Sequence, residues 1–78
     1  MERETIIAKL TDVFRSVFDN GELELSDELT ANDVENWDSL THMLLISEIE
    51  TAFQIKFRLK ELNKMRNVGD LIELLSNK

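Results

Sequence analysis

The sequence lacks cysteine, proline and tyrosine, and it contains two glycines among its 78 residues. Without cysteine, the chain has neither a disulfide framework nor a thiolate metal site, which fits a reducing compartment, and we expect a cytoplasmic protein. Without proline, helix boundaries have to be predicted from caps and glycines. No long apolar run occurs, and the start "MERETIIAKL" is charged from its second residue. Neither a membrane span nor a signal peptide is therefore expected.

Lysine and arginine are also missing from the middle of the chain. Residues 16–55 contain ten acids and no base, whereas the two ends together carry nine bases against six acids, and the formal net charge is -7. A negative field repels phosphate backbones and steers the protein toward basic protein surfaces, so nucleic acid is not an expected partner. The same acids also keep a small domain soluble, and charge alone does not separate these two roles.

Apolar residues recur at helical spacing in two long segments. The first pattern predicts an amphipathic helix from about residue 4 to 18, and Asn20-Gly21 is expected to stop it. The second predicts a helix that begins at residue 38 or 39 and ends near residue 53. Its inward face is expected to consist of Leu45, Ile46, Ile49 and Phe53.

Two further helices are expected near the end of the chain. One is a short helix between residues 58 and 64, and the last begins after Asn67, a residue that can cap it. Residues 22–37 form an irregular, acidic connection, and connections of that length are usually functional. The expected fold class is therefore all-α. It is a four-helix bundle of three main helices and one short helix with a long first loop, formed by residues 1–78 as a single monomeric domain.

Two patterns that suggest a metal site or catalysis fail at key positions. The stretch "FDNGELELSDEL" imitates a calcium loop, but counting back from Gly21 places Ser16 and Phe18 where oxygen ligands belong, so no metal is expected. Ser39 and His42 lie three residues apart like a nucleophile and its base, yet no orienting group and no oxyanion hole accompany them. We therefore expect His42 to be an exposed, non-catalytic residue and the protein not to be an enzyme.

The stretch "NWDSLTHMLL", residues 36–45, places Asp38 and Ser39 directly before an apolar helix. Both residue types are preferred helix N-caps, so the pair can be read as a cap and nothing more. One cap residue suffices, however. If Asp38 takes that role, the Ser39 hydroxyl is free to point outward at the positive end of a helix, which is a favourable place for an attached phosphate.

A longer segment containing this serine resembles the acyl carrier protein family. The segment is "ELSDELTANDVENWDSLTHMLLISEIETAFQIKF", in which an aspartate, a serine and a leucine open the second helix and "EIETAF" closes it. The similarity continues through "NVGDLIELL" and covers essentially the whole chain. Within the family, "WDSLTHMLLI" resembles the stand-alone carriers attached to specialised biosynthetic or surface-polysaccharide gene sets more than the housekeeping fatty-acid carrier.

The resemblance implies a specific cofactor and specific partners. Ser39 is expected to receive 4'-phosphopantetheine from coenzyme A through a phosphopantetheinyl transferase. The thiol of this arm is expected to hold acyl groups as thioesters during fatty acid or specialised metabolite biosynthesis. Acyl-loading and acyl-using enzymes with basic docking patches are the other expected partners. A protein of this kind needs no catalytic residues of its own, and its reactive sulfur arrives with the cofactor.

A partner surface follows from the helical geometry. If the second helix buries the inward face given above, then Leu40, Met43 and Leu44 form an apolar patch beside Ser39 on the other side of the helix, and Asp38 and Glu48 rim it. The simpler alternative is that Met43 or Leu44 folds inward against the long loop. In the resembling family, acids on this helix pair with basic residues of partner enzymes.

Several residues depart from the family pattern, and two other functions remain open. Asn36 stands where a glycine is common, Leu44 occupies a position that is often acidic, and Arg58 replaces a frequent proline. Trp37 is expected to act as a core plug, that is, to fill space in the core, with part of its indole in contact with the phosphopantetheine arm. A peptidyl or aminoacyl carrier is one alternative, although such carriers are typically less acidic. A small acidic adaptor that binds a partner through the second helix and is never modified is the other.

Overall fold

The computed structural model describes residues 2–78, which contain helices and no strand. The elements are α1 (Arg3–Val17), the short 3-10 helix η1 (Ala31–Asp33), α2 (Ser39–Phe53), α3 (Leu59–Leu62) and α4 (Val68–Ser76). The predicted all-α bundle of three main helices and one short helix is confirmed, including the long connection between α1 and α2. The 3-10 turn inside that connection was not predicted.

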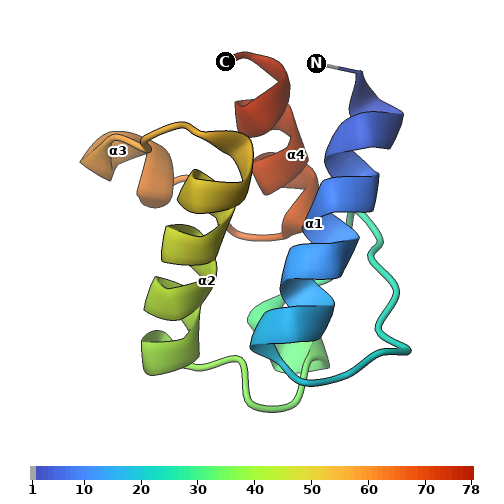
Figure 1. The fold of residues 1–78 in the computed structure, drawn as a ribbon. Coiled ribbons are helices and arrows are strands. Elements are labelled where there is room, and N and C mark those ends of the chain that lie inside the picture. The colour runs from blue at the N-terminus through green and yellow to red at the C-terminus, as the bar shows by residue number, and fades with distance from the viewer. Residues whose placement is uncertain (1) are drawn as a thin grey trace.

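The helices are arranged around α1. Figure 1 shows α1 running down one side of the molecule and α2 running up the other side, so that these two helices are antiparallel, while α4 rises next to α1 toward the end that holds both termini. α3 projects beside the last turn of α2, at the end of α2 that is remote from Ser39. None of the helices described here is long and apolar enough to cross a membrane.

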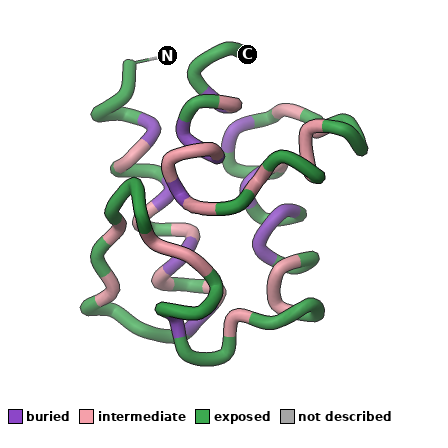
Figure 2. Tube along the Cα trace, turned by 180° about the vertical axis from the view of Figure 1, so that it is seen from behind, coloured by how far each residue is buried: buried purple, intermediate pink, exposed green. Residues whose placement is uncertain are grey.

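One apolar core joins α1, α2 and α4. Figure 2 shows that the buried positions lie mainly on the helices, whereas most of the long connection is exposed or half-buried, and Val34 is its buried residue. The predicted inward face of α2 is confirmed, because all four of its residues are buried. The fully buried residues with the largest side chains are Phe14, Ile6, Leu10, Leu45, Ile49, Ile72 and Val68. Burying their apolar surface stabilises the fold by roughly 25 cal/mol for each Å² that is removed from water.

The helix ends follow local chemistry, with one difference from the prediction. α1 ends at Val17 with Phe18 as its C-cap, and the residue that takes up the left-handed conformation after it is Asp19 (φ 49°) rather than Gly21. Aspartate tolerates this conformation better than most residues, so glycine is not required there. α2 ends at Phe53, and its C-cap Gln54 is also left-handed (φ 55°). α4 begins as predicted, because Asn67 Oδ1 accepts a hydrogen bond of 2.8 Å from the Asp70 backbone N–H.

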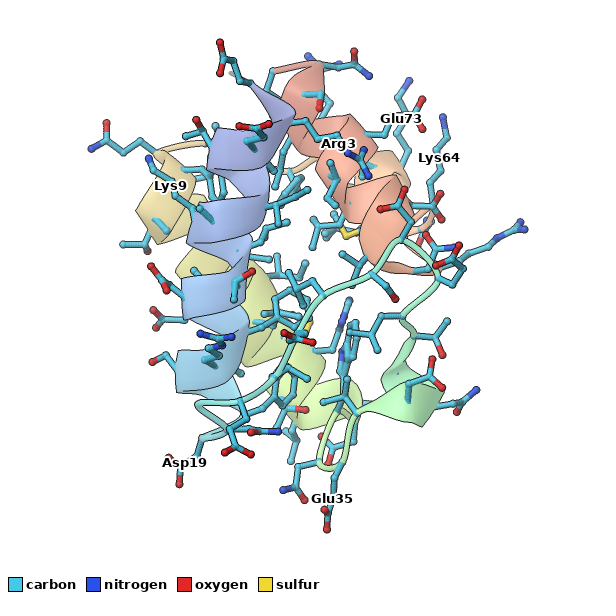
Figure 3. The ribbon with its side chains drawn as sticks, turned by 90° about the vertical axis from the view of Figure 1, so that its right-hand side faces the viewer. Arg3, Lys9, Asp19, Glu35, Lys64 and Glu73 are labelled. Atoms are coloured by element: carbon cyan, nitrogen blue, oxygen red, sulfur yellow. The ribbon has the colours of Figure 1, made fainter. Side chains whose placement is uncertain are left out.

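The long connection is fixed to the bundle by hydrogen bonds at its middle. The backbone N–H groups of Val68 and Gly69, at the start of α4, donate to the carbonyl oxygens of Leu29 and Asp27 at 2.9 Å each. A Cβ atom on Gly69 would lie 3.1 Å from the Asp27 oxygen, so a glycine suits this close approach. Figure 3 shows the connection crossing the space between α1 and α4, with Asp19 and Glu35 pointing away from the core at the far end. Because the connection is anchored in this way, the start of α2 has a fixed position relative to α1 and α4.

Candidate functional site

Ser39 is the first residue of α2, and its side chain is exposed to solvent. The cap of α2 is Asp38, whose Oδ1 accepts hydrogen bonds of 3.0 Å from the backbone N–H groups of Leu40 and Thr41. The capping role is therefore filled by the aspartate. The Ser39 hydroxyl is left outside the cap, at the positive end of a helix of 15 residues.

The turn that precedes Ser39 is closed by Thr41. Its hydroxyl accepts a hydrogen bond of 2.8 Å from the Asp38 backbone N–H and donates one of 2.6 Å to the carbonyl oxygen of Asn36. Asn36 has a φ of 72°, a left-handed conformation in which asparagine is one of the better tolerated residues. The Thr41 backbone N–H, together with that of Leu40, also lowers the pKa of the Asp38 carboxyl below its ordinary value. The carboxylate form, which accepts these hydrogen bonds, is thus favoured at neutral pH.

A pocket of about 370 Å³ opens beside Ser39. Its floor and walls are mostly apolar, and Ser39 and Asp38 lie among the residues at its boundary. The other lining residues are Ala31, Trp37, His42, Leu45, Ile46, Met65, Arg66, Asn67 and Leu71. They come from η1, from the connection just before α2, from α2 itself, and from the segment around the start of α4. An apolar group tethered to Ser39 would therefore have a pocket within reach.

His42 is half-buried, so the expectation that it is exposed is wrong. Its Nδ1 accepts a hydrogen bond of 3.1 Å from the indole N–H of Trp37, and burial lowers the pKa of its imidazole. Because Nδ1 is occupied by Trp37, that nitrogen is not available to take a proton from Ser39. Trp37 in turn packs on the core through Phe14 and Phe18, with ring centroids 5.4 Å and 5.7 Å apart, in agreement with the predicted core plug.

The outer face of α2 is apolar and open to solvent. Leu40 is 83% exposed, Met43 67% and Leu44 49%, so the alternative in which Met43 or Leu44 folds inward is wrong. Glu48 is exposed on the same helix, two turns after Leu40 and one turn after Leu44. The structure thus brings the predicted patch and its acidic rim together next to Ser39.

Sequence reasoning missed the contribution of the chain end to the site. Met65, Arg66 and Leu71 line the pocket although they follow Ser39 by more than 25 residues. The apolar spacing in the sequence places Leu71 on the buried face of the last helix. It gives no sign that these three residues share a pocket with Ser39. The Trp37–His42 hydrogen bond was also missed, although the spacing of five residues across the start of a helix is compatible with it.

Comparison with known proteins assigns the family. No protein-family model and no curated protein sequence matches the chain. The chain is similar to the solution NMR structure of the holo acyl carrier protein from Geobacter metallireducens, with 49% sequence identity and a TM-score of 0.87. The match covers 92% of this chain and 83% of that protein. The chain belongs to the acyl carrier protein family, and the family predicted from its sequence is confirmed.

Proposed function

We propose that Ser39 is the residue of this carrier that holds 4'-phosphopantetheine, and that the thiol of this arm carries acyl groups as thioesters to biosynthetic enzymes. The observation that carries the proposal is the exposed serine hydroxyl at the first position of α2, left outside the helix cap by Asp38. The similarity to a carrier solved in its holo form supports the cofactor. The whole segment 1–78 would act as one carrier domain.

The attachment step uses the serine oxygen and needs little else from this chain. A phosphopantetheinyl transferase would remove the proton from the Ser39 hydroxyl as its oxygen attacks the pantetheine phosphorus of coenzyme A. A new oxygen–phosphorus bond forms, the pyrophosphate bond breaks, and the adenosine bisphosphate leaves. The phosphodiester anion that results would lie at the positive end of α2, where the helix dipole would favour it. When bound, the arm supplies the thiol that this cysteine-free chain lacks.

The residues around Ser39 fit an arm and its partners. The pocket beside the serine offers an apolar space for cargo, and the exposed face formed by Leu40, Met43 and Leu44 offers a contact for an enzyme that reaches the arm. Asp38 and Glu48 would meet basic groups of the transferase and of the loading and acyl-using enzymes. The chemistry would be performed by those enzymes, in the cytoplasm, with this protein as a monomeric carrier.

Modification of Ser39 is directly testable by mass. The purified protein is incubated with coenzyme A, magnesium and a promiscuous phosphopantetheinyl transferase, and intact masses are measured for the wild type, Ser39→Ala and Ser47→Ala. We expect one phosphopantetheine on the wild type and on Ser47→Ala, because Ser47 is an exposed serine of the same helix that does not begin it. We expect none on Ser39→Ala.

Two results would contradict this proposal. An adduct that persists in Ser39→Ala would place the arm on another residue. No adduct on the wild type with several transferases would favour the unmodified adaptor that uses the same face of α2.

Charge reversal on α2 tests the docking surface. For Glu48→Lys, we expect the KM for this carrier in acyl loading by its cognate enzyme to rise about threefold or more at low ionic strength, because a rim acid steers the encounter with a basic patch. The difference should shrink as salt is added. Glu73→Lys, on α4, makes the same change of charge at an exposed position away from α2 and is the matched control. Equal responses of the two variants would show that only net charge matters.

A further inference from the structure

The indole of Trp37 forms part of the wall of the pocket beside Ser39. It is held from two sides. Toward the core, it packs edge-on against Phe14 with centroids 5.4 Å apart and against Phe18 at 5.7 Å. Toward α2, its N–H donates to His42 Nδ1 at 3.1 Å, and the two ring planes are within 18° of parallel. His42 is therefore one of the residues that contact this wall, and it is the one that accepts its hydrogen bond.

The hydrogen bond between the two rings exists in one protonation state of His42. Nδ1 can accept from the indole N–H while the imidazole is neutral, and the remaining proton then lies on Nε2. In the imidazolium ion both nitrogens carry hydrogen, so Nδ1 has no lone pair to offer. The half-buried indole N–H then loses its acceptor, and leaving a donor unpaired away from water is unfavourable. The indole is expected to shift until water can reach its N–H.

The surroundings of His42 favour the neutral form. Burial lowers the pKa of its imidazole below the ordinary 6.5. Two charged residues, Asp38 at the start of α2 and Arg66 before α4, line the same pocket, and their charges are of opposite sign. α1 contributes aromatic rings to the Trp37 side. The unfolded chain binds a proton at His42 more readily than the folded chain does. The contribution of His42 to the free energy of unfolding is therefore fully present above pH 6.5 and is lost as the pH falls through the lowered pKa.

We propose that His42 is the positioning residue for Trp37, and that neutral His42 holds the indole in place as the wall that shelters the cargo of this carrier. The part of this inference that concerns the cargo rests on the proposed function. The first test, described next, does not depend on that function. The pocket is expected to shelter an apolar acyl chain at neutral pH and to lose that shelter when His42 gains a proton.

The first measurement uses the unmodified protein. Trp37 is the only tryptophan and the chain has no tyrosine, so its fluorescence reports this side chain alone. We expect the fluorescence to titrate with a midpoint below pH 6.5. The methyl NMR signals of Ile46 and Met65, which line the same pocket, should move with the same midpoint because the ring current of the indole moves. His42→Gln keeps an acceptor oxygen and does not titrate, so neither signal should change over this range.

The second measurement uses the protein loaded with an octanoyl thioester. The rate of thioester cleavage by hydroxylamine is compared at each pH between the wild type and His42→Gln, which removes the effect of pH on the reagent. We expect the ratio of wild-type to variant rates to rise about fivefold as the pH falls through the midpoint found by fluorescence. An unpaired donor is unfavourable enough to change the population of the displaced indole by about that factor.

The outcomes separate this inference from the proposed function. A fluorescence midpoint at or above 6.5, or methyl signals that do not follow it, would overturn the positioning role. A flat ratio of cleavage rates would overturn the sheltering role even if the rings titrate together. If Ser39 accepts no arm, the proposed function fails alone, because the first measurement still decides whether His42 positions Trp37.

Discussion

Replacing Phe14 with alanine is expected to remove about 3–5 kcal/mol from the free energy of unfolding. The side chain is fully buried on α1 and touches the rings of Phe18 and Trp37, so its loss leaves a cavity at the centre of the core. A chain of 78 residues has a total stability of about 4–12 kcal/mol, so this single change removes much of it. Urea denaturation of the wild type and the variant measures the difference.

The same variant also tests how the core supports the pocket. Phe14 holds the inner side of Trp37, and we expect the tryptophan emission of the folded variant to shift to longer wavelength as the indole becomes more exposed. Ser16→Ala, an exposed change on the same helix, is the control and should alter stability by no more than about 0.5 kcal/mol. A loss below about 1.5 kcal/mol for Phe14→Ala would mean that the core repacks around the cavity.

Replacing Asp38 with alanine is expected to lower the melting temperature by about 4–8 °C. The variant loses the oxygen that accepts from the N–H groups of Leu40 and Thr41, so the first turn of α2 should fray. Because Ser39 is in that turn, we also expect slower attachment of phosphopantetheine. Thermal melting followed by circular dichroism and the rate of adduct formation measure the two effects.

Asp38→Asn separates the cap from the charge. Asparagine keeps an acceptor oxygen and should retain most of the melting temperature. In the wild type, the hydrogen bonds that lower the pKa of Asp38 favour the carboxylate, so its contribution is present above the ordinary value of 3.8 and is lost as the pH falls through the lowered value. The difference in melting temperature between wild type and Asp38→Asn should therefore shrink below pH 3.8. A difference that stays constant would assign the effect to shape rather than charge.

The helices were predictable because their signals are local. Apolar spacing located α1 and α2 within a residue or so, and Asn67 marked the start of α4, since a cap depends on atoms within one helical turn. The position at which α1 ends was predicted, but the residues that end it were not. Asn20-Gly21 was expected to stop the helix, but the left-handed residue after it is Asp19, because the choice among neighbouring tolerant residues depends on how the next segment packs.

The candidate site was predictable in part for the same reason. Asp38 and Ser39 are adjacent, so their competition for the cap could be stated from the sequence, and the exposure of Met43 and Leu44 followed from the inward face of α2. The burial of His42 did not follow. Its partner Trp37 is placed by rings on α1, and such a contact between distant segments leaves no periodic signal.

The sequence by itself determined the all-α fold class, the acidic middle, the helix that begins with Asp38 and Ser39, and the resemblance to acyl carriers. All of these depend on residue type and on spacing within a few turns. Only the tertiary structure decided that Met65 and Leu71 close a pocket beside Ser39 and that His42 bonds to Trp37. The reason is that packing brings together residues far apart in the chain, and their contact depends on how three helices meet rather than on any one of them.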